Sequence, residues 1–228
     1  MSTYEIHLEY GGRIRNDFNT LCDRFGTDKG SVSCRSKYFD WPPHTYGDFY
    51  SLIFGHCRES VKKFFECGIG SVDATVPSNM GGNYSPGASL LMWREYFPNA
   101  EVYGADIDRS VLFTEDRIRT YYVDQTDLES VVAMWREIDT FDFDVIIDDG
   151  LHTLDAAICL FEGSAGRLKK DGIYLIEDVA YLEMPKYRSY FDGVDYAALY
   201  VTMFGGEYER GSELRNSIIV LQNIAGRT

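Results

Sequence analysis

Two apolar runs that end in acids constrain the fold of this chain more than any other feature. The first covers residues 145–152 with the sequence VIIDDGLH, and the second covers residues 172–178 with the sequence GIYLIED. Apolar runs of strand length that end in acids are typical of α/β proteins, where parallel strands bring charge to the sheet edge that binds ligands. Two such strands would gather up to four carboxylates and one imidazole around a single crevice.

The rest of the chain alternates strand-like and helix-like segments, which predicts a parallel sheet with right-handed crossovers. Strands are expected at about residues 62–67, 101–106, 120–124, 143–149 and 173–178, with intervening helices at 88–97, 128–138 and 154–168. Two further strand-like runs, residues 196–204 and 216–222, have no clear helix between them and are expected to pair antiparallel. Five βα steps followed by such a pair are the pattern of Rossmann-like methyltransferases.

Length and composition bound the organisation of the chain. A chain of 228 residues is long enough for one domain with a short appendage. Residues 1–60 are expected to form an N-terminal helical cap, with helices near 13–25 and 46–57 and an aromatic loop between them. Residues 61–228 would form the main domain. The residues near 26–45 could serve as a lid over a site or as an interface.

Charge and cysteine usage exclude several classes of partner. The formal net charge of -14 disfavours nucleic acid and anionic membranes, because no basic surface is present to release counterions. The sequence shows no signal peptide and no long apolar span, so a cytoplasmic protein is expected. Five cysteines without CxxC spacing fit reduced structural thiols in that compartment.

The first strand runs into a glycine turn that predicts the cofactor. Glu66 precedes Gly68 and Gly70, but Asp73 stands where a dinucleotide-binding turn needs its third glycine. An acid two residues before the first glycine is typical of S-adenosylmethionine sites, where it meets the cationic aminoacyl end. Asp106 closes the second strand and is placed to accept hydrogen bonds from ribose hydroxyls.

Three more residues complete the predicted cofactor pocket. Asp124 and Gln125 close the third strand and could meet the adenine, and Asp148 closes the fourth. Each acid could instead be a solvated strand end or a helix cap. Acids at four successive strand ends favour the cofactor interpretation.

The acids of the two opening runs predict a metal site and a base. Asp149, Glu177 and Asp178 are hard oxygen ligands without accompanying cysteines or a histidine pair, which suits Mg²⁺, or Mn²⁺, better than zinc. Because successive strand residues face opposite ways, Asp149 is expected at the metal and Asp148 at the cofactor. His152 could take a proton from a hydroxyl that the metal polarises, or it could merely cap the next helix.

Seven short motifs resemble the metal-dependent class I methyltransferases of the mycinamicin and macrocin sugar O-methyltransferase type. They are GTDK at 26–29, ECGIG at 66–70, SLLMWREYFPNA at 89–100, YGADI at 103–107, DQTD at 124–127, IDDGLH at 147–152 and IED at 176–178. The resemblance implies a seven-stranded, mostly parallel sheet of order 3-2-1-4-5-7-6 with helices on both faces. It also implies that Asp149, Glu177 and Asp178 hold Mg²⁺, that His152 is the general base, and that the protein is a homo-oligomer.

The acceptor implied by the resemblance is small and polar. The loop at residues 71–86 looks closer to relatives in bacterial surface-polysaccharide clusters than to the antibiotic enzymes. The expected acceptor is therefore a hydroxyl of a sugar, a sugar nucleotide, a glycan precursor or another small metabolite of polysaccharide or natural-product biosynthesis. Two other functions stay open, an NAD(P)-linked oxidoreductase and a non-catalytic binding protein that keeps the fold.

Overall fold

The computed structural model describes residues 3–9, 16–30, 38–39, 41, 44–204 and 217–224. The chain groups into two compact units. Unit 1 comprises residues 1–10 and 123–228, and unit 2 comprises residues 11–122. In the part of the chain that is described, no helix combines the length and the apolarity that crossing a membrane requires.

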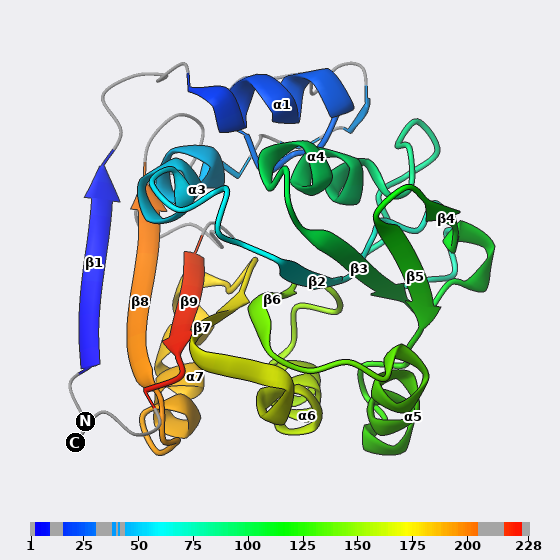
Figure 1. Ribbon diagram of the computed structural model, residues 1–228. Helices are drawn as coiled ribbons and strands as arrows, with labels where there is room; N and C mark the ends of the chain where they lie inside the picture. The colour runs from blue at the N-terminus through cyan, green and yellow to red at the C-terminus, as the bar shows by residue number, and fades with distance from the viewer. Residues whose placement is uncertain are drawn as a thin grey trace. The chain divides into compact units, whose positions relative to one another are not determined.

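Unit 2 contains four strands in the order β2-β3-β5-β4. The strands β2, β3 and β5 are parallel, and β4 is antiparallel to β5. The helices α1, α3 and α4 lie together on one side of these strands (Figure 1). The elements in chain order are α1 (Asp17–Phe25), α3 (Tyr46–Phe54), β2 (Lys63–Cys67), α4 (Ala88–Tyr96), β3 (Glu101–Asp106), the 3₁₀ turn η1 (Arg109–Val111), β4 (Thr114–Glu115) and β5 (Ile118–Tyr122).

An aromatic cluster holds the helices of unit 2 against its strands. The ring centroid of Trp93 on α4 lies 5.1 Å from that of Phe18 on α1 and 4.8 Å from that of Phe64 on β2. All three side chains are fully buried, and such contacts add to the free energy of burial. Helix α1 begins after Asn16, whose side chain accepts from the backbone N–H of Asn19. The cluster thereby fixes the loop that follows α1 close to β2.

Unit 1 contains five strands in the order β1-β8-β9-β7-β6. The pairs β6–β7 and β1–β8 are parallel, whereas β9 is antiparallel to both of its neighbours. Helices α5, α6 and α7 lie on one side of these strands (Figure 1). The elements are β1 (Thr3–Glu9), α5 (Leu128–Ile138), β6 (Phe143–Asp148), α6 (Leu154–Ser164), the 3₁₀ turn η2 (Ala165–Arg167), β7 (Leu168–Ile176), the 3₁₀ turn η3 (Tyr181–Glu183), α7 (Met184–Phe191), β8 (Ala197–Phe204) and β9 (Ser217–Gln222).

The structure confirms the alternating α/β pattern and the antiparallel C-terminal pair, and it corrects several details. Nine strands are present among the described residues rather than seven, because β1 and β4 were not predicted. Residues 3–9 form a strand beside β8, where a helical cap was expected. The predicted helix over 154–168 ends at Ser164, where glycines at 163 and 166 weaken helix propensity. The residues between the two strands of this pair, 205–216, lie outside the described residues.

The compact units do not share the predicted boundary. They divide the chain after residues 10 and 122, whereas the sequence predicts a division after residue 60. The boundaries of the compact units do not test whether residues 1–60 act as a cap on the main domain. The predicted cap at 1–60 and main domain at 61–228 therefore stay a prediction.

Candidate functional site

In unit 2, a tight glycine turn follows β2. Gly68 and Gly70 have φ values of +89° and +91°, in the region that side chains other than glycine rarely adopt. A Cβ atom on Gly70 would lie 2.3 Å from Cε1 of Tyr84. The backbone N–H of Gly68 donates to the carbonyl of Ala105 at 2.8 Å. The turn thus requires glycine at both positions and lies at the carboxyl end of β2, next to the end of β3.

Asp106 closes β3 and binds the glycine turn. One of its carboxylate oxygens accepts from the backbone N–H of Ile69 at 2.9 Å, and the other accepts from that of Asp108 at 2.9 Å. Burial raises the pKa of this carboxyl, and the two N–H donors oppose that rise. A carboxylate has about four acceptor positions, so Asp106 retains capacity for the predicted ribose hydroxyls.

Glu66 is enclosed by protein donors. Its side chain is fully buried, and its oxygens accept from Ser89 Oγ at 2.5 Å and from Trp93 Nε1 at 3.1 Å. The ammonium of Lys29, which is also fully buried, lies 3.3 Å from Glu66 Oε1. The charge of Glu66 is therefore balanced within the protein. The predicted contact of Glu66 with the cationic end of a cofactor stays a prediction.

Breaking this buried pair is expected to destabilise the protein. Lys29→Met leaves the Glu66 carboxylate buried without its counter-charge, which typically costs about 3–5 kcal/mol. The double variant Lys29→Met/Glu66→Gln removes both charges and is expected to recover a large part of that loss. Chemical denaturation of the single and double variants measures both effects, with exposed Lys62→Met as the control. Equal unfolding free energies for Lys29→Met and Lys62→Met would contradict the buried pair.

In unit 1, the turns that follow β6 and β7 bring three predicted residues together. One ligand atom each of Asp149, His152 and Asp178 can be chosen so that the three atoms lie within 4.8 Å of one another. Nε2 of His152 lies 3.4 Å from Asp149 Oδ1, and its Nδ1 lies 3.8 Å from Asp178 Oδ2. Glu177 is not part of this group; its side chain is buried, and its backbone N–H donates to the carbonyl of Asp148.

The carboxylates around His152 set its charge. Burial by itself lowers the pKa of the imidazole, but Asp178, Asp149 and Asp148 outweigh burial and raise the pKa to about 9. His152 is therefore protonated at neutral pH when these carboxylates are not neutralised. Burial raises the pKa of the neighbouring Asp148 carboxyl to about 6, against the opposing effects of His152 and two hydrogen bonds.

The donor set fits a hard divalent cation. The carboxylates of Asp149 and Asp178 offer the hard oxygen ligands that Mg²⁺ or Mn²⁺ prefers, and His152 lies within 4 Å of both. The buried atom Asp148 Oδ2 beside this donor set has no hydrogen-bond partner among the described residues, and His152 Nε2 has its ion pair with Asp149 but no hydrogen bond. Buried polar atoms without partners are costly and call for an explanation, and a bound cation with its water ligands supplies one.

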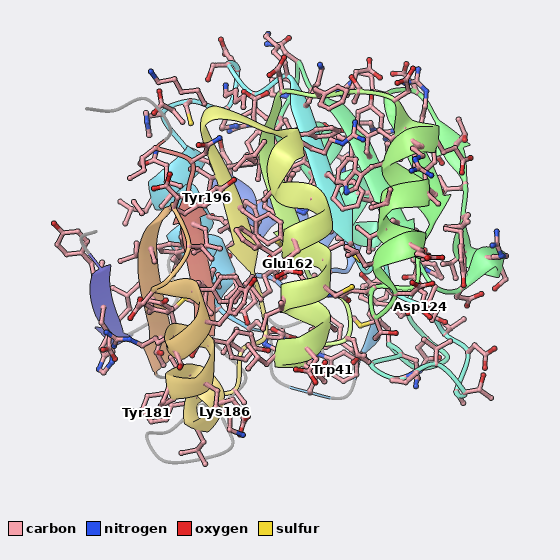
Figure 2. The ribbon with its side chains drawn as sticks, turned by 90° about the horizontal axis from the view of Figure 1, so that it is seen from below. Trp41, Asp124, Glu162, Tyr181, Lys186 and Tyr196 are labelled. Carbon is pink, nitrogen blue, oxygen red and sulfur yellow. The ribbon has the colours of Figure 1, made fainter. Side chains whose placement is uncertain are left out.

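Asp124 and Gln125 form local contacts in unit 1. Asp124 lies beside the start of α5 (Figure 2), where its Oδ1 accepts from the backbone N–H and the hydroxyl of Thr126. Gln125 is buried, and its amide bonds the side chain of Asp148 and the backbone of Leu151. Neither residue's predicted contact with adenine is tested by these bonds.

Sequence reasoning missed three residues of these clusters as site residues. Ser89 and Trp93, four residues apart on α4, both donate to Glu66, and this spacing puts them on one helical face. The four-residue spacing of a serine and a tryptophan in the predicted helix could have indicated two donors on the same helical face. For Lys29 the signal was its place in the GTDK motif at 26–29; its burial follows only from the packing of α1.

Comparisons with known proteins identify related enzymes. No family model matches the chain. It is 32% identical over 172 residues to the 8-demethyl-8-alpha-L-rhamnosyl tetracenomycin-C 2'-O-methyltransferase of Streptomyces olivaceus, covering 75% of this chain and 40% of that protein. It is 32% identical to the mycinamicin VI 2''-O-methyltransferase of Micromonospora griseorubida and 30% identical to the demethylmacrocin O-methyltransferase of Streptomyces fradiae. These two matches cover 74% and 72% of this chain and 37% and 36% of those proteins.

The chain thus spans about two fifths of the length of these relatives. The last two confirm the predicted resemblance to enzymes of the mycinamicin and macrocin type. A solved structure of the mycinamicin-pathway methyltransferase MycE, in complex with Mg and SAH (S-adenosylhomocysteine), is 29% identical and superimposes with a TM-score of 0.58. That match covers 77% of this chain and 40% of MycE.

A second solved structure supports the fold over a larger share of both chains. The Staphylococcus aureus protein assigned as a caffeoyl-CoA O-methyltransferase superimposes with a TM-score of 0.55 over 92% of this chain and 93% of that one. Its identity of 10% restricts the comparison to the fold. Together with MycE, it shows that this chain has the class I methyltransferase fold.

Proposed function

We propose that this chain, a relative of the sugar O-methyltransferases of the mycinamicin and macrocin type, transfers a methyl group from S-adenosylmethionine to a sugar hydroxyl with the help of Mg²⁺. The observation that carries the proposal is the convergence of Asp149, His152 and Asp178 in unit 1. A methyltransferase fold that only bound its cofactor would not need a base between two carboxylates.

The relatives support the cofactor and the class of acceptor. MycE was crystallised with Mg and SAH, and also with Mg, SAH and mycinamycin VI. The name of the Streptomyces olivaceus relative describes methylation of the 2'-oxygen of a rhamnosyl tetracenomycin. For this chain we propose a hydroxyl of a sugar, a sugar nucleotide or a glycan precursor as the acceptor.

Each unit contains its own set of proposed binding residues. In unit 2, Glu66, Gly68, Gly70 and Asp106 would bind the aminoacyl and ribose parts of the cofactor. In unit 1, Asp124 and Asp148 would contact the cofactor, as the sequence predicts. Asp149 and Asp178 would hold the metal, whereas Glu177, the third ligand predicted from the sequence, lies outside their group.

His152 would act as the base. When bound, Mg²⁺ supplies positive charge that makes an acceptor hydroxyl more acidic. A bound cation would also offset the carboxylates of Asp149 and Asp178, which raise the pKa of His152, so that the imidazole would more readily be neutral. The neutral imidazole can then take the hydroxyl proton while the oxygen bonds to the methyl carbon and the carbon–sulfur bond breaks.

Some finer predictions belong to this proposal as well. The strand order 3-2-1-4-5-7-6 is proposed as a whole, supported by the partial orders β5-β3-β2 in unit 2 and β6-β7-β9-β8 in unit 1. Helices on both faces of the sheet and a homo-oligomeric state are proposed on the resemblance, and a cytoplasmic location is proposed on the cysteine usage of the sequence.

Calorimetric titration with S-adenosylhomocysteine tests the cofactor. We expect micromolar binding that Asp106→Ala weakens at least tenfold, because the variant loses the predicted ribose acceptor and the anchor of the glycine turn. The exposed acid Asp116 supplies the control variant, Asp116→Ala. Tight binding of NADH in place of S-adenosylhomocysteine would overturn the proposal in favour of an oxidoreductase.

A further inference from the structure

The amide of Gln125 bridges the end of β6 and the turn that follows it. Gln125 stands in the loop before α5 and is 7% exposed. Its Nε2 donates to Asp148 Oδ1 at 2.6 Å, and its Oε1 accepts from the backbone N–H of Leu151 at 2.9 Å. The amide nitrogen and the amide oxygen of Gln125 therefore both form hydrogen bonds within residues 148–151.

The glycine at position 150 leaves the space in the turn that this amide occupies. A Cβ atom on Gly150 would lie 2.1 Å from Oε1 of Gln125, so any other residue there would displace the amide. The backbone N–H of Gly150 also donates to Asp148 Oδ1 at 3.3 Å. The same carboxylate oxygen thus accepts from the amide and from the turn, which joins all three residues in one network.

This turn carries two of the residues proposed for the reaction. Asp149 lies between the two residues that Gln125 bonds, and His152 follows directly after Leu151. His152 has a φ of +58°, a backbone conformation that costs free energy in a residue other than glycine. Such a conformation persists only where the surroundings impose it, and the bond from Leu151 to Gln125 holds the residue immediately before it.

We infer that Gln125 is a positioning residue for Asp149 and His152, and that it fixes the metal-binding turn rather than the adenine of the cofactor. The inference rests on the proposed function, because it assigns Gln125 to the metal half of the site. It replaces the adenine contact predicted from the sequence. The two predictions differ in which affinity depends on Gln125.

Separate binding measurements on Gln125→Met distinguish the two roles. Methionine keeps the length and volume of glutamine but can neither donate to Asp148 nor accept from Leu151. The affinity for Mn²⁺, measured by electron paramagnetic resonance, is expected to fall about 10–100-fold, as for other residues that orient metal ligands. The affinity for S-adenosylhomocysteine, measured without metal by calorimetry, is expected to stay unchanged.

The chain's other glutamine provides a matched control. Gln222 ends β9 in the same unit, and Gln222→Met is expected to change neither affinity. Circular dichroism confirms folding, and Gln125→Asn, which keeps the amide but is too short to reach both partners, serves as the second variant if Gln125→Met does not fold.

Each outcome supports or overturns the assignment of Gln125 to the metal-binding turn. Weaker Mn²⁺ binding with unchanged S-adenosylhomocysteine binding supports it. Loss of S-adenosylhomocysteine binding, alone or together with Mn²⁺ binding in a folded variant, overturns it, and so does no change in either affinity. Failure of the wild-type protein to bind Mn²⁺ would instead overturn the proposed metal site itself, and the role of Gln125 with it.

Discussion

Replacing His152 with alanine is expected to reduce methyl transfer by about 10²–10⁴-fold, the usual contribution of a positioned general base. The affinity for S-adenosylhomocysteine should be unchanged, because the imidazole lies among carboxylates of the metal site. Initial rates with labelled S-adenosylmethionine, using an acceptor found by screening sugars and sugar nucleotides, measure the first quantity. Calorimetry measures the second.

The backbone of His152 calls for a second variant. At its φ of +58° alanine is strained, whereas asparagine is several times more common in this region. His152→Asn is therefore expected to lose as much turnover as His152→Ala while retaining more stability. Exposed His56→Ala is the control and should keep full turnover. If the His152 variants lost cofactor affinity as much as turnover, the histidine would not be the base.

Removing the carboxylate of Asp149 is expected to have the second large effect. Asp149→Asn keeps the shape of the side chain but removes a charged ligand, so the affinity for Mn²⁺ should fall more than about 100-fold, beyond the range found for indirect partners. Methyl transfer should fall in parallel, as should the activity of the wild-type protein after chelation. Added Mg²⁺ should restore the chelated wild type but not the variant.

Asp155 offers a matched control for this substitution. It is an exposed acid in the first turn of α6, close in sequence to Asp149. Asp155→Asn makes the same change of charge and should leave Mn²⁺ binding and turnover unaffected. Equal losses in the two variants would indicate a general effect of negative charge. Unchanged Mn²⁺ binding in Asp149→Asn would remove the carboxylate from the metal site.

The sequence by itself was sufficient for the pattern of elements and for the place of the acids. Strands and helices follow from apolar periodicity, which is a local property of the chain. The expected strand over 101–106 and helix over 128–138 agree with β3 and α5. The acids Asp106 and Asp148 do close their strands, and both side chains are buried there.

The side-chain partners were decided only by the tertiary structure. Nothing local distinguishes Lys29 from a solvated lysine, and it is buried because α1 packs on α4 and carries the following loop to Glu66. The fold of unit 1 brings the amide of Gln125 to Asp148 and Leu151, which the sequence alone does not indicate. Strand β1 pairs with β8 from the other end of the chain. Local periodicity therefore fixes which segments form strands and helices, whereas contacts between residues distant in sequence exist only once the whole chain has packed.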